Sequence, residues 1–341
     1  MSIRDIRHCN VCVVGGAGFL GSHLVDHLAV DRGCNVLVID NLITGRKEFV
    51  HPKAKFEYCD ITGSESYLLK LFEAYDINFV FNYAAEPYIP VSFERPIHVF
   101  NINAFGALKV INAAHEAGVG GILQVSSAEI YGMGNLNCPK EAQHEGRICE
   151  ECPVTPHSTY GAAKAAIDSM VQVRWKEAQV PVISLRQFNC IGERETHPYI
   201  VPEIISQLAK QPLKKHGKSE AVVRLGNNSF RDFQYAGDAV RMAVELLENG
   251  QFGQVYNMGS ETGVKMYDLA KEIGEIMGFD KTEVVTDASR IRPWEIWHLL
   301  SDNTRLYQAI GERGPMHRAA ALRNTVNSFR ENGNQWAWES K

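Results

Sequence analysis

Short apolar runs rich in β-branched residues alternate with amphipathic runs through the first half of the chain. The strand-like runs cover residues 10–14, 35–39, 56–59, 78–82, 121–125 and 182–188, and the last of these closes the series. Apolar positions at helical spacing predict helices over residues 22–29, 67–75, 103–117 and 159–176. Strands that alternate with helices in this way are typical of a parallel, doubly wound α/β sheet.

The alternation weakens after Asn189, where loops rich in Gly, Pro and charge separate helical patterns at residues 202–210, 236–248 and 266–277. A chain of 341 residues accommodates an α/β core and a smaller second part. We therefore expect the chain to pass from the α/β core to the smaller second part near residue 190. Some later segments are expected to return to the core.

Composition narrows the class of protein. The chain is 45% hydrophobic and 22% charged, as in ordinary globular proteins, and its net charge is -5. No stretch is dense in Lys or Arg, which argues against nucleic acid as a partner. No run approaches the ~20 apolar residues of a membrane span, and the N-terminal residues do not match a signal peptide. We expect a cytoplasmic protein that binds neither nucleic acid nor membrane.

The eight cysteines are scattered along the chain. Several lie inside apolar strand patterns, namely Cys12, Cys34 and Cys190, and we expect buried free thiols in a reducing cytosol. Two Cys-x-x-Cys pairs occur, Cys9 with Cys12 and Cys149 with Cys152, and four thiolates can hold zinc. Because Cys12 lies in the strand that leads into a glycine loop, we expect no metal site. A redox pair at Cys149 and Cys152 is equally unsupported by the sequence.

The glycine loop carries the first chemical signal. Gly15, Gly18 and Gly21 occur in GGAGFLG, directly after a predicted strand and before a predicted helix. Backbone without Cβ turns tightly there and approaches a pyrophosphate, whose charge lies at the helix N-terminus. Asp40 ends the second strand about twenty residues later, where a carboxylate accepts hydrogen bonds from ribose hydroxyls and repels a 2′-phosphate. NAD is therefore predicted over NADP, although Arg46 lies nearby.

Further residues at the same edge of the sheet are candidate cofactor contacts, since the carboxyl ends of parallel strands meet there. They follow successive strands or lie in the loop and helix beside them: Phe19, Leu20, Asn41, Asp60, Ile61, Ala84, Ala85 and Asn103.

Tyr160 and Lys164 form the candidate acid/base pair. They are four residues apart in YGAAK on a predicted helix, so both side chains project from one face. A nearby ammonium and a positive nicotinamide ring stabilise a phenolate, and we expect both to lower the tyrosine pKa from ~10 toward neutrality. Ser127, at the end of another strand, can hydrogen-bond the same substrate oxygen.

With these motifs the chain resembles the extended short-chain dehydrogenase/reductase family, specifically its NAD-dependent nucleotide-sugar epimerases, dehydratases and decarboxylases. The resemblance runs from about Asn10 to about Phe329, and it adds SSAEIYG, FN, RDF and RIRPWE to the motifs above. It implies that Asn189, Arg231 and Arg292 hold the sugar-nucleotide pyrophosphate, in keeping with the fit of guanidinium to phosphate.

The resemblance also implies an organisation for the whole chain. We expect a Rossmann-like NAD-binding domain over residues 1–190, a mainly substrate-binding domain over residues 191–330 and a tail over residues 331–341. A homodimer through the helices near residues 104–117 and 160–176 follows from the same likeness.

The resemblance leaves three reactions open, each starting with oxidation of the sugar at C4. A 4-epimerase turns the 4-keto sugar over, a 4,6-dehydratase removes the C5 proton and water, and a decarboxylase acts on a uronic acid. Glu129 occupies the place where dehydratases and decarboxylases of the family carry a catalytic glutamate. The alternative role for Glu129 is a strand-end carboxylate that caps backbone amides.

We favour the 4,6-dehydratase, with a UDP-sugar 4-epimerase second and a UDP-glucuronate-type decarboxylase third. Ala128 stands where many dehydratases have the acid for the departing hydroxyl, so Glu129 would have to serve as both base and acid. The alternative from a different class of function is a non-catalytic dinucleotide sensor of the same fold. Such a protein should lack the pair of Tyr160 and Lys164, and this chain has both.

Overall fold

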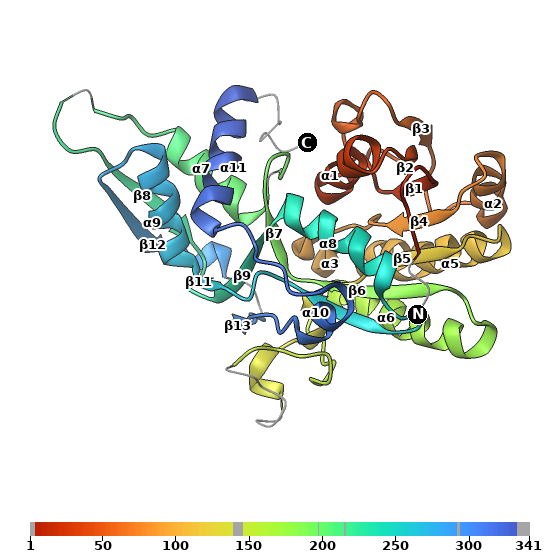
Figure 1. Cartoon of the computed structure of the whole chain (residues 1–341). Helices are drawn as coiled ribbons and strands as arrows, with labels where there is room; N and C mark the ends of the chain where they lie inside the picture. Colours follow the sequence, from red (N-terminus) through yellow and green to blue (C-terminus); the bar gives the residue numbers. More distant parts are fainter. Residues whose placement is uncertain (1–3, 139–145, 197, 215, 292–293, 333–341) are drawn as a thin grey trace.

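The computed structural model describes residues 4–138, 146–196, 198–214, 216–291 and 294–332. Its largest element is a seven-stranded sheet in the order β10-β6-β5-β4-β1-β2-β3, in which every neighbouring pair is parallel (Figure 1). The strands are β1 (Asn10–Val14), β2 (Asn35–Asp40), β3 (Lys55–Tyr58), β4 (Phe79–Asn82), β5 (Gly121–Val125), β6 (Val182–Gln187) and β10 (Val255–Met258). The predicted parallel, Rossmann-like α/β fold is confirmed.

Helices cover both faces of this sheet because its central strands are apolar on both sides. One face packs on α1 (Phe19–Asp26), α8 (Ala236–Asn249) and α10 (Thr304–Ile310), and the other on α2 (Glu65–Ala74), α5 (Ala107–Glu116) and α6 (Thr159–Ala178). Shorter helical segments join them: η1 (His27–Asp31), η2 (Lys47–Phe49), α3 (Ile89–Glu94), α4 (Pro96–Phe100), η3 (Asn101–Gly106), η4 (Ala128–Tyr131) and η5 (Gly134–Asn137).

A second, smaller core lies beside the sheet, on the left in Figure 1. Its strands are β7 (Asn189–Ile191), β8 (Glu220–Leu225), β9 (Phe230–Tyr235), β11 (Gly263–Lys265), β12 (Lys281–Thr286) and β13 (His298–Leu299). Its helices are α7 (Ile200–Ala209), α9 (Met266–Met277), α11 (Arg318–Asn332) and the short η7 (Ala288–Arg290). β7 follows β6 directly and pairs with β9, so the two parts of the molecule meet at residues 187–191.

One detail of the prediction is wrong. The strand at residues 182–188 does not close the sheet, because β10, from the second half of the chain, pairs with β6 at the edge. A run of four residues inside the irregular half carries too little local pattern to be assigned from sequence. The predicted helix at 103–117 begins with π-helical turns in η3 before it becomes α5, and such turns are frequent at functional sites.

The expectation that all cysteines are free thiols is also wrong, since Cys138 and Cys152 form a disulfide. The other six cysteines, all among the described residues, form no disulfide. Among the described residues, no group of three or more His, Cys, Asp or Glu side chains is placed to hold a metal ion. None of the helices in the described part of the chain combines the length and apolar character needed to cross a membrane.

Candidate functional site

The glycine loop lies against the end of β4, where the strand order reverses between β1 and β4. Gly15 has φ +79°, and a Cβ there would lie 2.6 Å from the backbone nitrogen of Ala84. At Gly21 a Cβ would lie 2.0 Å from the carbonyl oxygen of Gly15. Both positions therefore require glycine. Dinucleotides bind at this kind of switch point, and a loop without side chains leaves room for the pyrophosphate, so the cradle fits NAD.

Asp40 ties the end of β2 to the glycine loop. Its carboxylate accepts hydrogen bonds from the backbone nitrogens of Ala17 at 3.0 Å and Leu42 at 2.8 Å. Burial raises the pKa of Asp40, and these backbone bonds oppose the shift. The backbone nitrogen of Asn41 is a third donor, so of the about four acceptor positions of a carboxylate one remains for a ribose hydroxyl. Next to it, Asn41 donates to Asp60 at 3.0 Å, which brings these strand-end candidates together.

Asn103 holds the backbone that follows β4. Its side chain is fully buried, accepts from the backbone nitrogen of Glu86 at 2.8 Å and donates to the Glu86 carbonyl at 3.0 Å. Asn103 lies inside η3, and these two hydrogen bonds join η3 to the segment that follows β4. Its placement supports a positioning role for this segment.

The other candidate cofactor residues lie in the same region. Phe19 and Leu20 are half-buried at the start of α1, Ala85 is half-buried next to Ala84, and Ile61 is buried against Gly106.

Tyr160 and Lys164 lie in the first two turns of α6, which Ser158 caps by accepting from the backbone nitrogen of Gly161 at 3.0 Å. Both side chains are buried. Lys164 Nζ donates to the carbonyl oxygen of Val125, the last residue of β5, at 2.9 Å. Ser127, two residues further on, hydrogen-bonds Tyr160. The structure thus brings all three predicted residues together between β5 and α6.

Burial dominates the electrostatics of the pair. Burial raises the pKa of Tyr160 to about 12, the hydrogen bond with Ser127 opposes this, and the charges of Glu129 and Glu86 add to it. Burial lowers the pKa of Lys164 to about 8. The protein groups alone therefore do not lower the tyrosine pKa, which leaves a positive charge on the cofactor as the group able to do so.

Glu129 lies in η4, directly after β5, where its backbone nitrogen donates to Ser127 Oγ at 3.2 Å. Glu129 lines a small pocket formed by α3, the residues just before α6 and the segment before β13. The pocket residues are Ile89, Phe93, Glu129, His157, Ser158, Trp294, Glu295 and Ile296. Ala128 points elsewhere, because it is 1% exposed inside the hydrophobic cluster behind η4.

The candidate pyrophosphate residues lie on neighbouring strands. Asn189 on β7 pairs with Phe233 on β9, two residues after Arg231. Arg231 is buried, and its guanidinium forms an ion pair with Glu295 at 2.6 Å. Arg292 lies outside the described residues.

Sequence reasoning missed two residues near Tyr160. Glu86 is 8% exposed; burial raises the pKa of both Tyr160 and Tyr199, and the charge of Glu86 adds to both shifts. Tyr199 in turn makes an edge-on ring contact with Tyr88. A glutamate directly after the strand-end NYAA segment was the available signal for Glu86; for Tyr199 the sequence offered none, since it depends on how the loop after β7 folds back.

Comparison with known proteins places these features in context. The model of the NAD dependent epimerase/dehydratase family matches residues 11–259. The dTDP-D-glucose 4,6-dehydratase of Mus musculus is 29% identical over 336 residues, covering 96% of this chain and 90% of that protein. UDP-glucuronic acid decarboxylase 1 of Arabidopsis thaliana is 31% identical over 275 residues, covering 80% of this chain and 59% of that protein.

Among solved structures, the UDP-glucose 4-epimerase of Thermus thermophilus in complex with NAD superposes with a TM-score of 0.80. It is 27% identical, and the match covers 94% of this chain and 99% of that one. Relatives of all three reaction types are therefore similar to this chain at comparable identity.

Proposed function

Because the chain belongs to the NAD-dependent epimerase/dehydratase family, with NAD as cofactor, we propose that it is a nucleotide-sugar 4,6-dehydratase. The observation that carries this proposal is the position of Glu129. Glu129 lines a pocket, and its charge adds to the effect of burial in raising the pKa of the Tyr160 phenol. A second acid/base group beside Tyr160 is what elimination requires and simple epimerisation does not.

The protein groups divide the reaction between them. NAD, which the glycine loop and Asp40 would hold, would supply the hydride acceptor for C4 and the hydride donor for the end of the reaction. Tyr160 takes the proton of the 4-hydroxyl at its phenolate oxygen, Ser127 orients that oxygen, and Lys164 supplies positive charge at the base of the site. Glu129 then removes the C5 proton, which the adjacent ketone acidifies, and protonates the departing 6-hydroxyl so that water leaves. Hydride returns to C6 and a proton to C5, so the product is lighter by one water.

The charges around the pocket bear on the two alternative reactions, decarboxylation and 4-epimerisation. Its described lining includes two carboxylates, Glu129 and Glu295, and no Lys or Arg. Glu295 is neutralised by its ion pair with Arg231, but a uronic acid substrate would still bring a second negative charge beside Glu129, which disfavours the decarboxylase. A 4-epimerase is the second candidate, because Ala128 supplies no separate acid and the similar Thermus thermophilus structure is a 4-epimerase.

Solvent exchange at C5 tests the proposal. The purified protein is incubated in deuterated water with UDP-, dTDP-, GDP- and CDP-hexoses, and products are read by mass. We expect one substrate to lose water and to gain deuterium at C5. No exchange at C5 during turnover, with unchanged product mass, would replace the dehydratase with the epimerase.

A pair of variants isolates the step assigned to Glu129. In Glu129→Gln, substrate should still reduce bound NAD, because C4 oxidation depends on Tyr160, and the reaction should then stall with persistent NADH absorbance. Glu94→Gln, which removes an exposed carboxylate from neighbouring α3, should turn over normally. Normal dehydration by Glu129→Gln would remove Glu129 from the mechanism.

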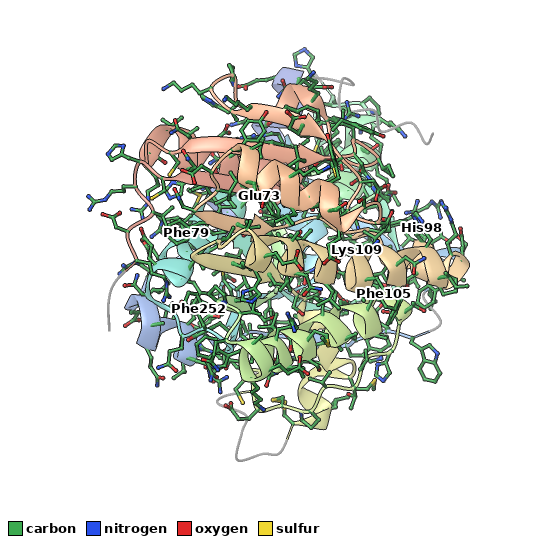
Figure 2. The ribbon with its side chains drawn as sticks, turned by 90° about the vertical axis from the view of Figure 1, so that its right-hand side faces the viewer. Glu73, Phe79, His98, Phe105, Lys109 and Phe252 are labelled. Atoms are coloured by element: carbon green, nitrogen blue, oxygen red, sulfur yellow. A yellow bond between two sulfur atoms is a disulfide. The ribbon has the colours of Figure 1, made fainter. Side chains whose placement is uncertain are left out.

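The proposal extends to a homodimer through the face formed by α4, η3 and α6. Ile97 and Phe105 are 76% and 57% exposed there, and with Pro96, Phe100 and Thr159 they line an open apolar groove. Figure 2 shows Phe105 on this face of the molecule. Apolar patches of this kind mark contact surfaces, and a second copy would cover it. Light scattering should give twice the chain mass, and Phe105→Glu should give the monomer mass; a monomeric wild type would refute the dimer.

A further inference from the structure

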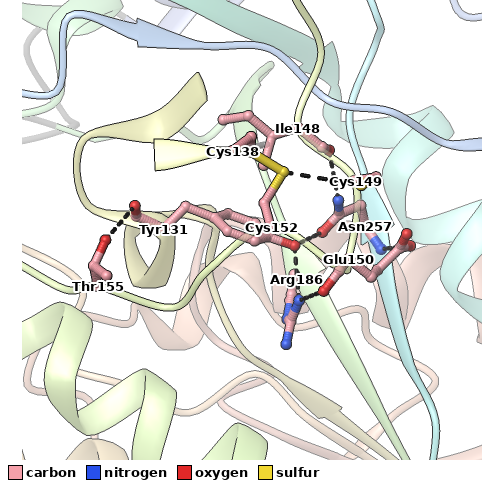
Figure 3. Close-up of a disulfide and its surroundings, with 9 residues drawn as sticks. All are labelled: Tyr131, Cys138, Ile148, Cys149, Glu150, Cys152, Thr155, Arg186 and Asn257. Atoms are coloured by element: carbon pink, nitrogen blue, oxygen red, sulfur yellow. Dashed lines mark hydrogen bonds between the residues drawn. A yellow bond between two sulfur atoms is a disulfide. The ribbon is translucent and has the colours of Figure 1, made fainter. Parts of the chain in front are cut away.

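Three cysteines meet behind the candidate catalytic loop. Cys138 and Cys152 form the disulfide, and the sulfur of Cys149 lies 3.9 Å from that of Cys152 (Figure 3). Cys138 and Cys152 are buried in the hydrophobic cluster behind η4, whereas Cys149 is half-buried at its edge. Cys152 therefore has two sulfur neighbours, one bonded and one in contact.

The backbone also allows the second pairing. The nitrogen of Cys152 donates to the carbonyl oxygen of Cys149 at 3.2 Å, which closes a four-residue turn. The first and last Cα atoms of such a turn lie less than ~7 Å apart, within the range that a disulfide spans. Moving the disulfide from Cys138 to Cys149 requires side-chain rotation rather than a new fold.

We propose that Cys149, Cys152 and Cys138 form a thiol–disulfide exchange site. The thiolate of Cys149 attacks the sulfur of Cys152, a Cys149–Cys152 bond forms, and the Cys138–Cys152 bond breaks. Cys138 leaves as the thiolate and takes up the proton that Cys149 released. One disulfide and one thiol are present before and after, so the exchange needs neither oxidant nor reductant.

The exchange is coupled to the loop that carries Glu129. Tyr131, two residues after Glu129, donates from its hydroxyl to Asn257 at 2.7 Å and accepts from Arg186 at 2.8 Å. The same Arg186 nitrogen donates to the carbonyl oxygen of Glu150 at 3.0 Å, inside the Cys149–Cys152 turn. Figure 3 shows this chain of contacts. A change in the conformation of the Cys149–Cys152 turn therefore alters the contacts of Arg186, which also holds Tyr131 of η4.

Packing in the hydrophobic cluster is a second connection between the cysteines and Glu129. Cys138 and Cys152 pack with Ala128, Ile130 and Tyr131, the residues on either side of Glu129. When the bond between Cys138 and Cys152 breaks, the cluster that packs against η4 loses its covalent cross-link. We therefore expect the Cys149–Cys152 form to hold Glu129 less firmly than the Cys138–Cys152 form.

Disulfide mapping tests the exchange without substrate, so its outcome is independent of the proposed function. The full-length wild type is held at pH 8, thiols are trapped with an alkylating reagent at successive times, and digested peptides are assigned by mass. We expect peptides of both pairings, Cys138–Cys152 and Cys149–Cys152, in a ratio that becomes constant. A single pairing at all times would overturn the proposal.

Two locked variants and one control make the result specific. Cys149→Ser should contain only the Cys138–Cys152 bond, and Cys138→Ser, after mild oxidation with glutathione disulfide, should show two thiols fewer than before oxidation. Cys9→Ser removes a half-buried thiol elsewhere and should retain both pairings. If Cys138→Ser folds but keeps both thiols free, the Cys149–Cys152 pairing is wrong.

The effect on catalysis rests on the proposed function and has its own readout. Since a displacement of 1 Å can cost a factor of ~100, we expect C5 exchange to be about tenfold slower in Cys138→Ser than in Cys149→Ser. Reduction of bound NAD by substrate, which depends on Tyr160, should change much less. Equal C5 exchange in both locked variants would remove the coupling to Glu129 and leave the exchange chemistry standing.

Discussion

Replacement of Lys164 by Met should stabilise the protein without bound nucleotide while abolishing sugar oxidation. Lys164 is 3% exposed, and its ammonium has the Val125 carbonyl as hydrogen-bond partner. The same carbonyl also accepts from Gln124 at 3.0 Å, so it keeps a partner in the variant. Met has nearly the length of the lysine stem and no charge to bury.

The magnitude follows from the pKa of Lys164, which burial lowers from 10.5 to about 8. The lysine of the unfolded chain keeps its proton up to pH 10.5, so the unfolded state binds more protons between pH 8 and 10.5. Below pH 8 the folded protein therefore bears the full cost of the buried charge, about 3 kcal/mol, and the cost falls to about 2 kcal/mol at pH 9. Relative to Lys164→Met, the wild type gains stability as pH rises.

Urea unfolding followed by tryptophan fluorescence measures this difference. Both proteins are first stripped of nucleotide, because bound NAD would stabilise the folded state of either. The variant should be more stable by about 3 kcal/mol at pH 7, and the gap should narrow by about 1 kcal/mol at pH 9. Lys176→Met, which replaces an exposed lysine of the same helix, should show no such pH-dependent gap.

Two results would refute this reasoning. A variant less stable than the wild type at pH 7 would show that Lys164 stabilises the fold. The free-energy cost of burying its charge would then be offset by its interactions. A gap that stays constant between pH 7 and 9 would show that the charge of Lys164 is not its source.

Three further predictions concern other parts of the site. Tyr160→Phe should retain NAD binding by fluorescence titration and lose at least ~100-fold in turnover, the scale of a positioned acid/base group. Gly21→Ala should abolish NAD binding or folding, judged by calorimetry, because its Cβ would lie 2.0 Å from the Gly15 carbonyl oxygen. Arg186→Met should lower stability in urea by about 3–5 kcal/mol, because Asp168, its partner at 2.8 Å, would remain buried and unpaired. Near-normal turnover, NAD binding or stability, respectively, would contradict each.

The sequence alone was enough for the features that depend on local spacing. The alternation of strands and helices predicted the parallel sheet, and the glycine triplet after the first strand predicted a loop without side chains at its edge. The four-residue spacing of Tyr160 and Lys164 placed both on one face of α6. Each of these follows from the period of a helix, the polarity of a strand or the lack of a Cβ, which are properties of a few consecutive residues.

Only the tertiary structure decided which distant segments meet. The pairing of β10 with β6 and the burial of Glu86 near Tyr160 join parts of the chain with no shared local pattern. The disulfide between Cys138 and Cys152 arises in the same way: the sequence showed Cys149 and Cys152 as a pair, yet the bonded partner of Cys152 is Cys138. Packing around η4 selects that partner, because contacts between distant residues depend on the shape of the whole core rather than on the spacing of neighbours.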